Sequence, residues 1–386
     1  MHRLLLYTIL PLTAAEPALL LVSYNDDLHS AQQLILANAR INEANDLGAT
    51  PLWAACQNGS VDMVRLLLEA GANPNVALLS GETPLMVAAR AGKTEIIRQL
   101  LARRADPNKT ATRRQTALMW AVAQKHPEVA KLLIANGANI HARSEACSEV
   151  MAVPPHGYRP YNKAIPHGND TALLLAARVG DFESAKLLIA AGANGNDADA
   201  WGVSATIYAA HSGYPEIVGL LLANKADPNA AAAGFTALHI AILRRDEAMA
   251  VALLAKGANP NTPLTTWTPT RRSSKDLHFP PALVGSSPFW LAARYQLPVV
   301  MRQLIKQGAN PKFIHHAHTV TDGLFEKRTQ SSTALQAALA KSGERESLVL
   351  ETVKAAVELG VDRSGALPAA KAHGYASVIK YLEETQ

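Results

Sequence analysis

The feature that most constrains the fold of this chain is a tripeptide that returns at intervals of 32 or 33 residues over much of the sequence. Thr-Pro-Leu, Thr-Ala-Leu or a close variant begins at Thr50, Thr83, Thr116, Thr171, Ser204, Thr236, Ser287 and Thr333. A second marker, Gly-Ala-Asn or a variant, follows the tripeptide in constant phase at Gly71, Arg104, Gly137, Gly192, Lys225, Gly257 and Gly308. Two markers that stay in step predict a repeat array, in which each unit is stabilised by its neighbours.

Each unit contains the signals of two antiparallel helices. Thr or Ser is a favourable N-cap and Pro is tolerated at the first helical position, so the tripeptide predicts a helix start. Small residues such as Ala54 and Ala55 follow, and they allow close contact between neighbouring helices. A second helix then presents apolar residues at helical spacing, as at Leu66 and Leu67. The glycine that opens the second marker predicts a left-handed residue after this helix.

Composition agrees with many small helix contacts. Hydrophobic residues make up 48% of the chain and aromatic residues only 5%. The net charge is +5, but the basic residues are interspersed with acidic ones and occur at most as isolated pairs. We therefore expect no nucleic-acid binding. The two cysteines cannot form a disulfide framework.

The pattern resembles the ankyrin repeat, whose helix start is Thr-Pro-Leu-His-x-Ala and whose period is 33 residues. The resemblance covers roughly residues 17 to 382. The fourth position departs from it, because only His239 keeps the histidine of the family. Elsewhere this position holds Trp53, Met86, Met119, Leu174, Ile207, Trp290 and Gln336.

The resemblance implies an all-α solenoid of about ten helix-turn-helix units joined by finger loops. We expect an N-terminal capping repeat at 17–42. Residues 331–384 are expected to hold the last internal repeat and a C-terminal capping repeat. The internal repeats are predicted at 43–141, 169–261 and 287–312. The family typically binds proteins, so we expect a protein partner and neither catalysis nor a cofactor.

The period breaks at three places, which are expected to be inserted finger loops at 142–168, 262–286 and 313–330. All three lie between the Gly-Ala-Asn marker and the next helix start. Aromatic, Arg and His side chains concentrate in them, and such residues frequently dominate binding interfaces. Loops held by a rigid scaffold commonly carry binding residues. Packing of these side chains against the edge of the array is the alternative.

We predict that the partner binds through the concave face and the enlarged finger loops of the array, by residues in the inserted loops and at the other finger tips. In the loops these are His156, Tyr158, Tyr161, Trp267, Arg271, Arg272, Phe279, His315, His316 and His318. At the other tips they are Leu79, Arg113, Arg114, Trp201 and Phe235. Exposed apolar tips would form a patch of the kind that marks an interaction site.

Two further functions remain open. The three histidines at 315, 316 and 318 could bind a transition metal, so a ligand- or metal-binding pocket among the inserted loops is the alternative function. The Arg pairs could form a basic patch for an acidic partner. The sequence contains no phosphate-binding loop, nucleophile elbow or paired-carboxylate motif.

The N-terminus reads as a short signal peptide. Arg3 precedes an apolar stretch from Leu4 to Leu12, and Thr13, Ala14 and Ala15 offer a small-residue cleavage site. We therefore expect a bacterial protein, with residues 1–15 removed on export to the periplasm or beyond. A leader on a cytoplasmic protein is the alternative. Pro11, Glu16 and Pro17 argue against stable insertion in a membrane.

Overall fold

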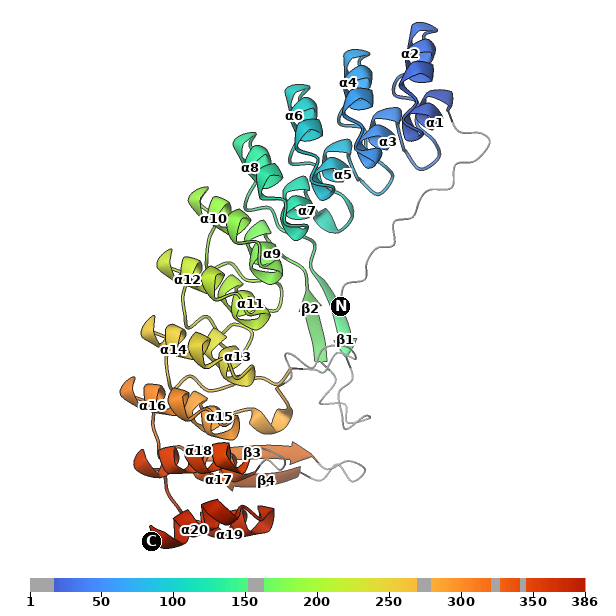
Figure 1. Cartoon of the computed structure of the whole chain (residues 1–386). Coiled ribbons are helices and arrows are strands. Elements are labelled where there is room, and N and C mark those ends of the chain that lie inside the picture. Colours follow the sequence, from blue (N-terminus) through green and yellow to red (C-terminus); the bar gives the residue numbers. More distant parts are fainter. Residues whose placement is uncertain (1–16, 152–162, 269–278, 321–326, 341–344, 386) are drawn as a thin grey trace. The chain divides into compact units, whose positions relative to one another are not determined.

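The computed structural model describes residues 17–151, 163–268, 279–320, 327–340 and 345–385 (Figure 1). The expected signal peptide at 1–15 lies outside these residues. The chain divides into two compact units, the first of residues 1–147 and 168–200 and the second of residues 148–167 and 201–386. Twenty α-helices fall in the described residues, and none of them is long and apolar enough to cross a membrane.

In its described residues, the first unit contains five helix pairs. They are α1 (Ala18–Tyr24) and α2 (Leu28–Leu36), α3 (Pro51–Asn58) and α4 (Val61–Glu69), α5 (Pro84–Arg90) and α6 (Thr94–Ala102), α7 (Ala117–Ala123) and α8 (Pro127–Ala135), and α9 (Ala172–Val179) and α10 (Phe182–Ala190). The first helix of each pair packs against the first helix of the next, and the second helices do the same. The buried core therefore continues from repeat to repeat.

The described residues of the second unit also form five pairs. They are α11 (Ala205–Ser212) and α12 (Pro215–Ala223), α13 (Ala237–Leu243) and α14 (Glu247–Ala255), α15 (Pro288–Arg294) and α16 (Pro298–Lys306), α17 (Ala334–Leu339) and α18 (Glu346–Glu358), and α19 (Ala366–His373) and α20 (Ala376–Glu384). The helices α11, α13, α15, α17 and α19 stack in order.

The helix starts lie where the repeated tripeptide predicts them. The hydroxyl of Thr50 accepts a hydrogen bond from Trp53 N (3.2 Å), and Thr83 and Thr116 cap their helices in the same way. The second marker is also confirmed, because Gly71 ends its repeat in the left-handed region at φ 91°. Arg104 takes the equivalent position at φ 62°, which costs a non-glycine residue about 1 kcal/mol.

Short strands accompany the helices, which the expectation of an all-α fold omitted. Strands β1 (Cys147–Met151) and β2 (Lys163–His167) pair with each other, and β3 (His315–Val320) pairs antiparallel with β4 (Lys327–Ser332). Both ribbons fall in segments where the period breaks. Backbone N–H and C=O groups need hydrogen-bond partners, and in each ribbon the two strands provide these partners for each other.

A row of asparagine side chains joins successive repeats. The amide of Asn75 accepts from Asp106 N (2.8 Å) and donates to Arg104 O (3.0 Å). Asn108 makes the same pair of bonds to Asn139 N and Gly137 O. In the second unit, Asn229 and Asn261 repeat the arrangement. The third residue of the Asn-Pro-Asn or Asp-Pro-Asn sequence is therefore a bridge between repeats, rather than only a turn residue.

Replacing Asn75 by alanine is expected to destabilise the first unit by about 1 kcal/mol, because both hydrogen bonds to the next repeat are lost at a partly solvated site. Urea unfolding of the full chain measures this loss. The exposed neighbour Lys109 offers a control, since its replacement by alanine removes no bridge. Equal stability of the Asn75 variant and the wild type would show that water replaces the bridge at no cost.

Candidate binding surface

The finger turns of the first unit form a continuous row. Leu79 N donates to Leu47 O (3.0 Å), Thr112 N donates to Ser80 O (2.9 Å), and Glu145 N donates to Arg113 O (2.7 Å). One backbone hydrogen bond thus fixes each turn to the preceding one. Side chains at neighbouring tips are therefore held close together and can act as one surface.

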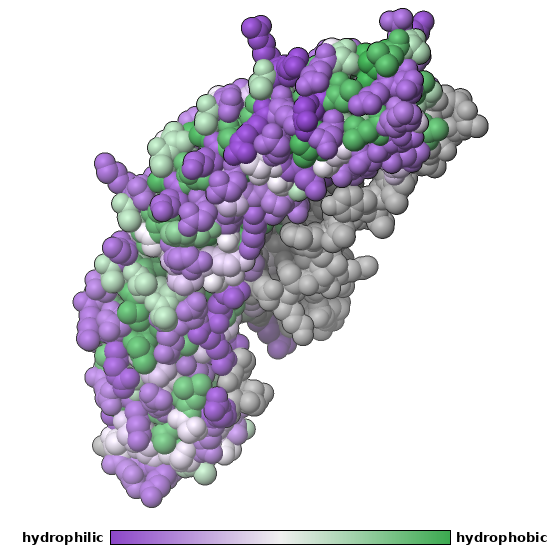
Figure 2. Space-filling model, turned by 45° about the horizontal axis from the view of Figure 1, so that its top comes forward, coloured by the Kyte–Doolittle hydropathy of each residue, from purple (hydrophilic) through white to green (hydrophobic). Residues whose placement is uncertain are grey.

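Apolar side chains are exposed on this row. The side chain of Leu79 is 80% exposed and that of Leu47 is 44% exposed. The adjacent Leu78 instead packs on a buried cluster that includes Trp53 and Val87. The turn therefore directs one leucine inward and the next one outward. On the face drawn in Figure 2, hydrophobic surface is scattered among hydrophilic side chains.

Arg113 and Arg114 occupy the next tip, and both are exposed. Their φ angles are 61° and 55°, in the left-handed region that favours glycine. At the position of Arg114 the two preceding turns have Gly48 and Gly81, each at φ 83°. The turn therefore carries backbone strain that glycine would remove, and in exchange it presents two guanidinium groups. We call Leu47, Leu79, Arg113 and Arg114 the tip surface.

The base of the segment 142–168 is fixed to the first unit. Ser144 N donates to Asp170 O (3.0 Å), and Asp170 N donates to the hydroxyl of Ser144 (2.9 Å). Arg143 forms an ion pair with Asp197 (2.7 Å) and donates to the carbonyl of Asn169. The predicted binding residues His156, Tyr158 and Tyr161 lie outside the described residues.

Three aromatic residues of the second unit that were predicted to bind a partner form a chain of ring contacts. The rings of Trp201 and Phe235 meet edge to face at 6.0 Å, and Phe235 lies 5.7 Å from Phe279. Phe235 and Phe279 are both fully buried, so the expectation that Phe235 is exposed is wrong, and Phe279 packs as the alternative for the inserted loops predicted. They fill the space between successive fingers, which an isolated tripeptide pattern does not reveal. Trp201 is half-buried.

The segment 262–286 is closed by backbone pairing. Leu264 N donates to Ser286 O (2.9 Å), and Gly285 N donates to Leu264 O (2.7 Å). Further out, Thr268 N donates to Phe279 O (2.9 Å). Trp267 is half-buried, whereas Arg271 and Arg272 lie outside the described residues.

The three histidines of β3 do not converge. Because side chains alternate along a strand, His316 and His318 share one face and His315 lies on the other. His316 Nδ1 lies 2.7 Å from the hydroxyl of Ser331, and His318 Nδ1 lies 3.1 Å from that of Thr329. His315 is buried, and its ring centre lies 4.4 Å from that of Trp290. Among the described residues, no three His, Cys, Asp or Glu side chains are placed to hold one metal ion.

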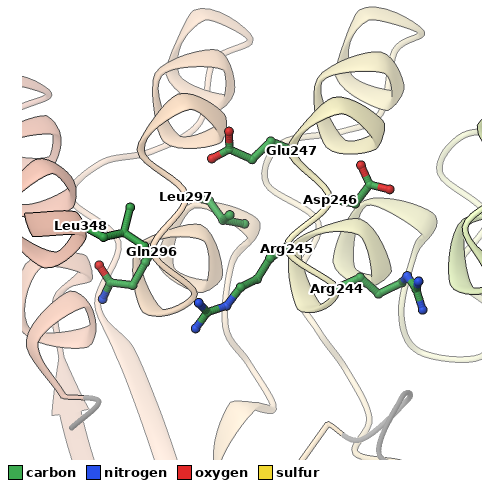
Figure 3. A pocket seen from close by; sticks show the side chains of 7 residues that line it. All are labelled: Arg244, Arg245, Asp246, Glu247, Gln296, Leu297 and Leu348. Atoms are coloured by element: carbon green, nitrogen blue, oxygen red, sulfur yellow. The ribbon is translucent and has the colours of Figure 1, made fainter. Parts of the chain in front are cut away.

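A hollow of about 580 Å³ lies in the second unit, at the turns that connect the two helices of a pair (Figure 3). Its lining residues come from the α13–α14 turn, the α15–α16 turn and the start of α18. They are Arg244, Arg245, Asp246, Glu247, Gln296, Leu297 and Leu348. Burial raises the pKa of the Glu247 carboxyl, and the nearby carboxylate of Glu351 raises it further. None of the lining residues belongs to an inserted loop, so the hollow is not the predicted loop pocket.

The first helices of successive pairs form one face of the array, which we call the first-helix face. Some residues on this face were not predicted from the sequence. Arg90 forms an ion pair with Glu82 (3.2 Å), and its guanidinium carbon lies 4.7 Å from the ring centre of Trp120. Burial raises the pKa of the Glu82 carboxyl, although Arg90 opposes this shift. An acidic residue directly before the capping Thr, with Arg eight residues later, is the sequence signal of this pair.

The chain matches the model of a known family. A model that describes ankyrin repeats in three copies matches residues 18–111, 71–144, 149–232 and 173–263. Together these ranges include more than half of the chain. No curated protein sequence matches it.

Proposed function

Because the chain belongs to the ankyrin-repeat family, we propose that it is a non-catalytic scaffold that binds a protein partner through the tip surface and the adjoining first-helix face. Members of this family are generally protein-binding. We further propose that the array has about ten units and that 142–168, 262–286 and 313–330 are enlarged finger loops. The paired bases of these segments support this proposal.

The observation that carries the proposal is the tip surface itself. Leu79 is almost fully exposed, although it is anchored by a backbone bond to the preceding turn. Next to it, Arg113 and Arg114 keep a left-handed backbone where glycine would be unstrained. Strained residues that stability does not require are typical of functional sites. An apolar side chain beside guanidinium groups suits a partner with an exposed apolar residue near carboxylates.

Replacing Arg113 and Arg114 by glycine separates binding from stability. Glycine relieves the left-handed strain, so the variant is expected to be more stable by about 1 kcal/mol for each residue that held a strained conformation. Capture of the partner from native extract is nevertheless expected to fall at least about tenfold, because charge-assisted contacts are lost. Urea unfolding and quantitative pull-down measure the two effects.

The replacement of Leu79 by serine provides the second arm, with Leu36 as the matched control. Leu36 is 78% exposed at the end of α2, away from the finger turns. Loss of capture in the Leu79 variant, with capture retained in the Leu36 variant, is the expected result. Equal capture by the wild type, the Leu79 variant and the glycine variant would exclude the tip surface as the binding site.

A further inference from the structure

An ion pair recurs at the first helices of two repeats. Arg90, the last residue of α5, pairs with Glu82 at 3.2 Å, and Arg178, near the end of α9, pairs with Asp170 at 2.6 Å. In both repeats the carboxylate precedes the capping threonine, and the arginine follows it by eight residues. The carboxylate side chains are only 15% and 13% exposed. A guanidinium at this place in the repeat therefore has a carboxylate partner from its own chain.

The repeat of α15 keeps the arginine and lacks the carboxylate. Arg294 is the last residue of α15, and Ser286 stands eight residues before it. The hydroxyl of Ser286 donates to Leu283 O (2.6 Å) and carries no charge. Arg294 is half-buried, and among the residues that the structure describes it has neither an ion pair nor a hydrogen bond. A half-buried charge without a partner is unfavourable, which points to an outside ligand.

Near Arg294, two buried polar atoms also have no hydrogen-bond partner within the described part of the chain. Trp290 Nε1 lies one helical turn before Arg294 on the same helix, and the Trp290 side chain is only 5% exposed. His315 Nδ1 is likewise unpartnered, and its residue is 1% exposed. The rings of Trp290 and His315 lie 4.4 Å apart. Buried polar atoms without hydrogen bonds are rare in native proteins, and each calls for an explanation.

We propose that Trp290, Arg294 and His315 bind the carboxylate of an outside molecule, at the place that Glu82 and Asp170 fill in their own repeats. The guanidinium of Arg294 offers paired donors that match a carboxylate, and the indole N–H of Trp290 offers one more. This carboxylate site lies in the second unit and does not depend on the tip surface. Its ligand is a free carboxylic acid, an acidic side chain or a chain terminus, all of which present the same group.

His315 makes binding depend on pH. Its Nε2 lies 2.8 Å from Ala282 O and donates to it, so Nδ1 of the neutral ring is an acceptor. Burial lowers the pKa of His315, and the charged or titratable groups near it, His316 and His318 on the other face of β3 and Arg294 on α15, lower it further, whereas the bond to Ala282 raises it. The residues of η3 (Pro281–Leu283) and the paired Ser332 bring no charge. A bound carboxylate favours the imidazolium, whose Nδ1–H donates to it, so affinity is expected to rise as pH falls.

Acetate is the probe that tests the site, with uncharged acetamide as the matched control. The indole N–H signals of the five tryptophans are followed by NMR on the full chain, and the signal of Trp290 is identified with the Trp290→Phe variant. Acetate is expected to shift the Trp290 signal saturably, with an affinity in the millimolar range, whereas acetamide leaves it in place. In Arg294→Gln the affinity is expected to fall about tenfold or more.

The Ser286→Asp variant supplies the missing carboxylate from within the chain. Its Trp290 signal is expected to lie near the acetate-saturated position, and acetate is expected to cause no further shift. An equal response to acetate and acetamide, or a response that Arg294→Gln and Ser286→Asp leave unchanged, would overturn the proposal. Two peptides then distinguish the possible sources of the carboxylate. A pentaalanine peptide with a free carboxyl terminus represents a chain terminus, and an amidated peptide with a central glutamate represents an acidic side chain. A response to acetate alone identifies small acids as the ligands.

Discussion

Replacing Phe235 by alanine is expected to lower the stability of the second unit by about 3–5 kcal/mol, which is the usual cost of removing a fully buried phenylalanine. Phe235 has no exposed surface and contacts both Trp201 and Phe279. Its removal leaves a cavity between two fingers, which the hydrogen-bonded turns cannot close without moving. The residue was predicted to bind a partner, but its burial makes it a packing residue.

Hydrogen exchange measured by mass spectrometry tests this prediction region by region, which suits a repeat array because its parts can unfold separately. Faster exchange is expected in α11 and α13, on either side of the cavity. Leu79→Ala is the control for an exposed position, where the change in stability is expected to stay within about 0.5 kcal/mol. A loss below about 1 kcal/mol for the Phe235 variant would contradict the packing role.

The second large effect is a loss of stability in acid that arises at His239. Nδ1 of this histidine accepts a hydrogen bond from Thr236 N (3.1 Å), while Thr236 Oγ1 accepts from His239 N. Burial lowers the pKa of His239 to about 4, and a smaller opposite effect comes from the backbone of Thr262. The folded protein thus keeps the ring neutral at pH values where the unfolded chain takes up a proton.

The direction of the effect follows from this difference. Well above pH 6.5, the ordinary histidine pKa, both states are neutral and the full stability is present. As pH falls from 6.5 to about 4, the unfolded state gains the proton first, and about 3 kcal/mol of stability is lost. Below the folded-state pKa the loss is complete. Urea unfolding at a series of pH values measures it.

Glutamine at position 239 is the matched control, because the chain already uses it. Gln336 takes the same place after Thr333, where Thr333 N donates to its side-chain oxygen (2.9 Å) and Gln336 N donates to the Thr333 hydroxyl (3.3 Å). His239→Gln therefore retains both capping bonds without a titrating ring. The difference between wild type and variant isolates His239 from the other histidines. Parallel pH profiles for the two proteins would disprove its role.

Much of the fold could be predicted from the sequence because the repeat signals are local. A capping hydroxyl such as that of Thr50 acts three residues along the chain, and a glycine such as Gly71 acts on its own φ angle. Repetition of such signals then indicates stacking. The β3–β4 ribbon was not predicted, because the two segments that pair His315 with Ser332 lack strong strand alternation.

The candidate sites were harder to predict because exposure depends on the neighbouring repeat. Leu78 and Leu79 are identical in type, yet one packs against the Trp53 cluster and the other is exposed. The outward position of Leu79 follows from the geometry of the turn, which cannot be read from the residue types alone. Arg294 is detectable only by comparison with Arg90 and Arg178, whose carboxylate partners occur in their own repeats.

The bridge made by Asn261 has a practical consequence. It joins Asn310 N (3.1 Å) and Gly308 O (2.9 Å) across an interval of 49 residues, with the same bonds that Asn75 makes across 31. The pairing of Leu264 with Ser286 closes the intervening segment. Lengthening a surface loop costs only about 0.6 kcal/mol per doubling. Foreign peptides grafted beyond the pair of Thr268 with Phe279, which spares the contact of Phe279 with Phe235, would leave the stacking intact, so the chain can serve as a display scaffold for engineered recognition loops.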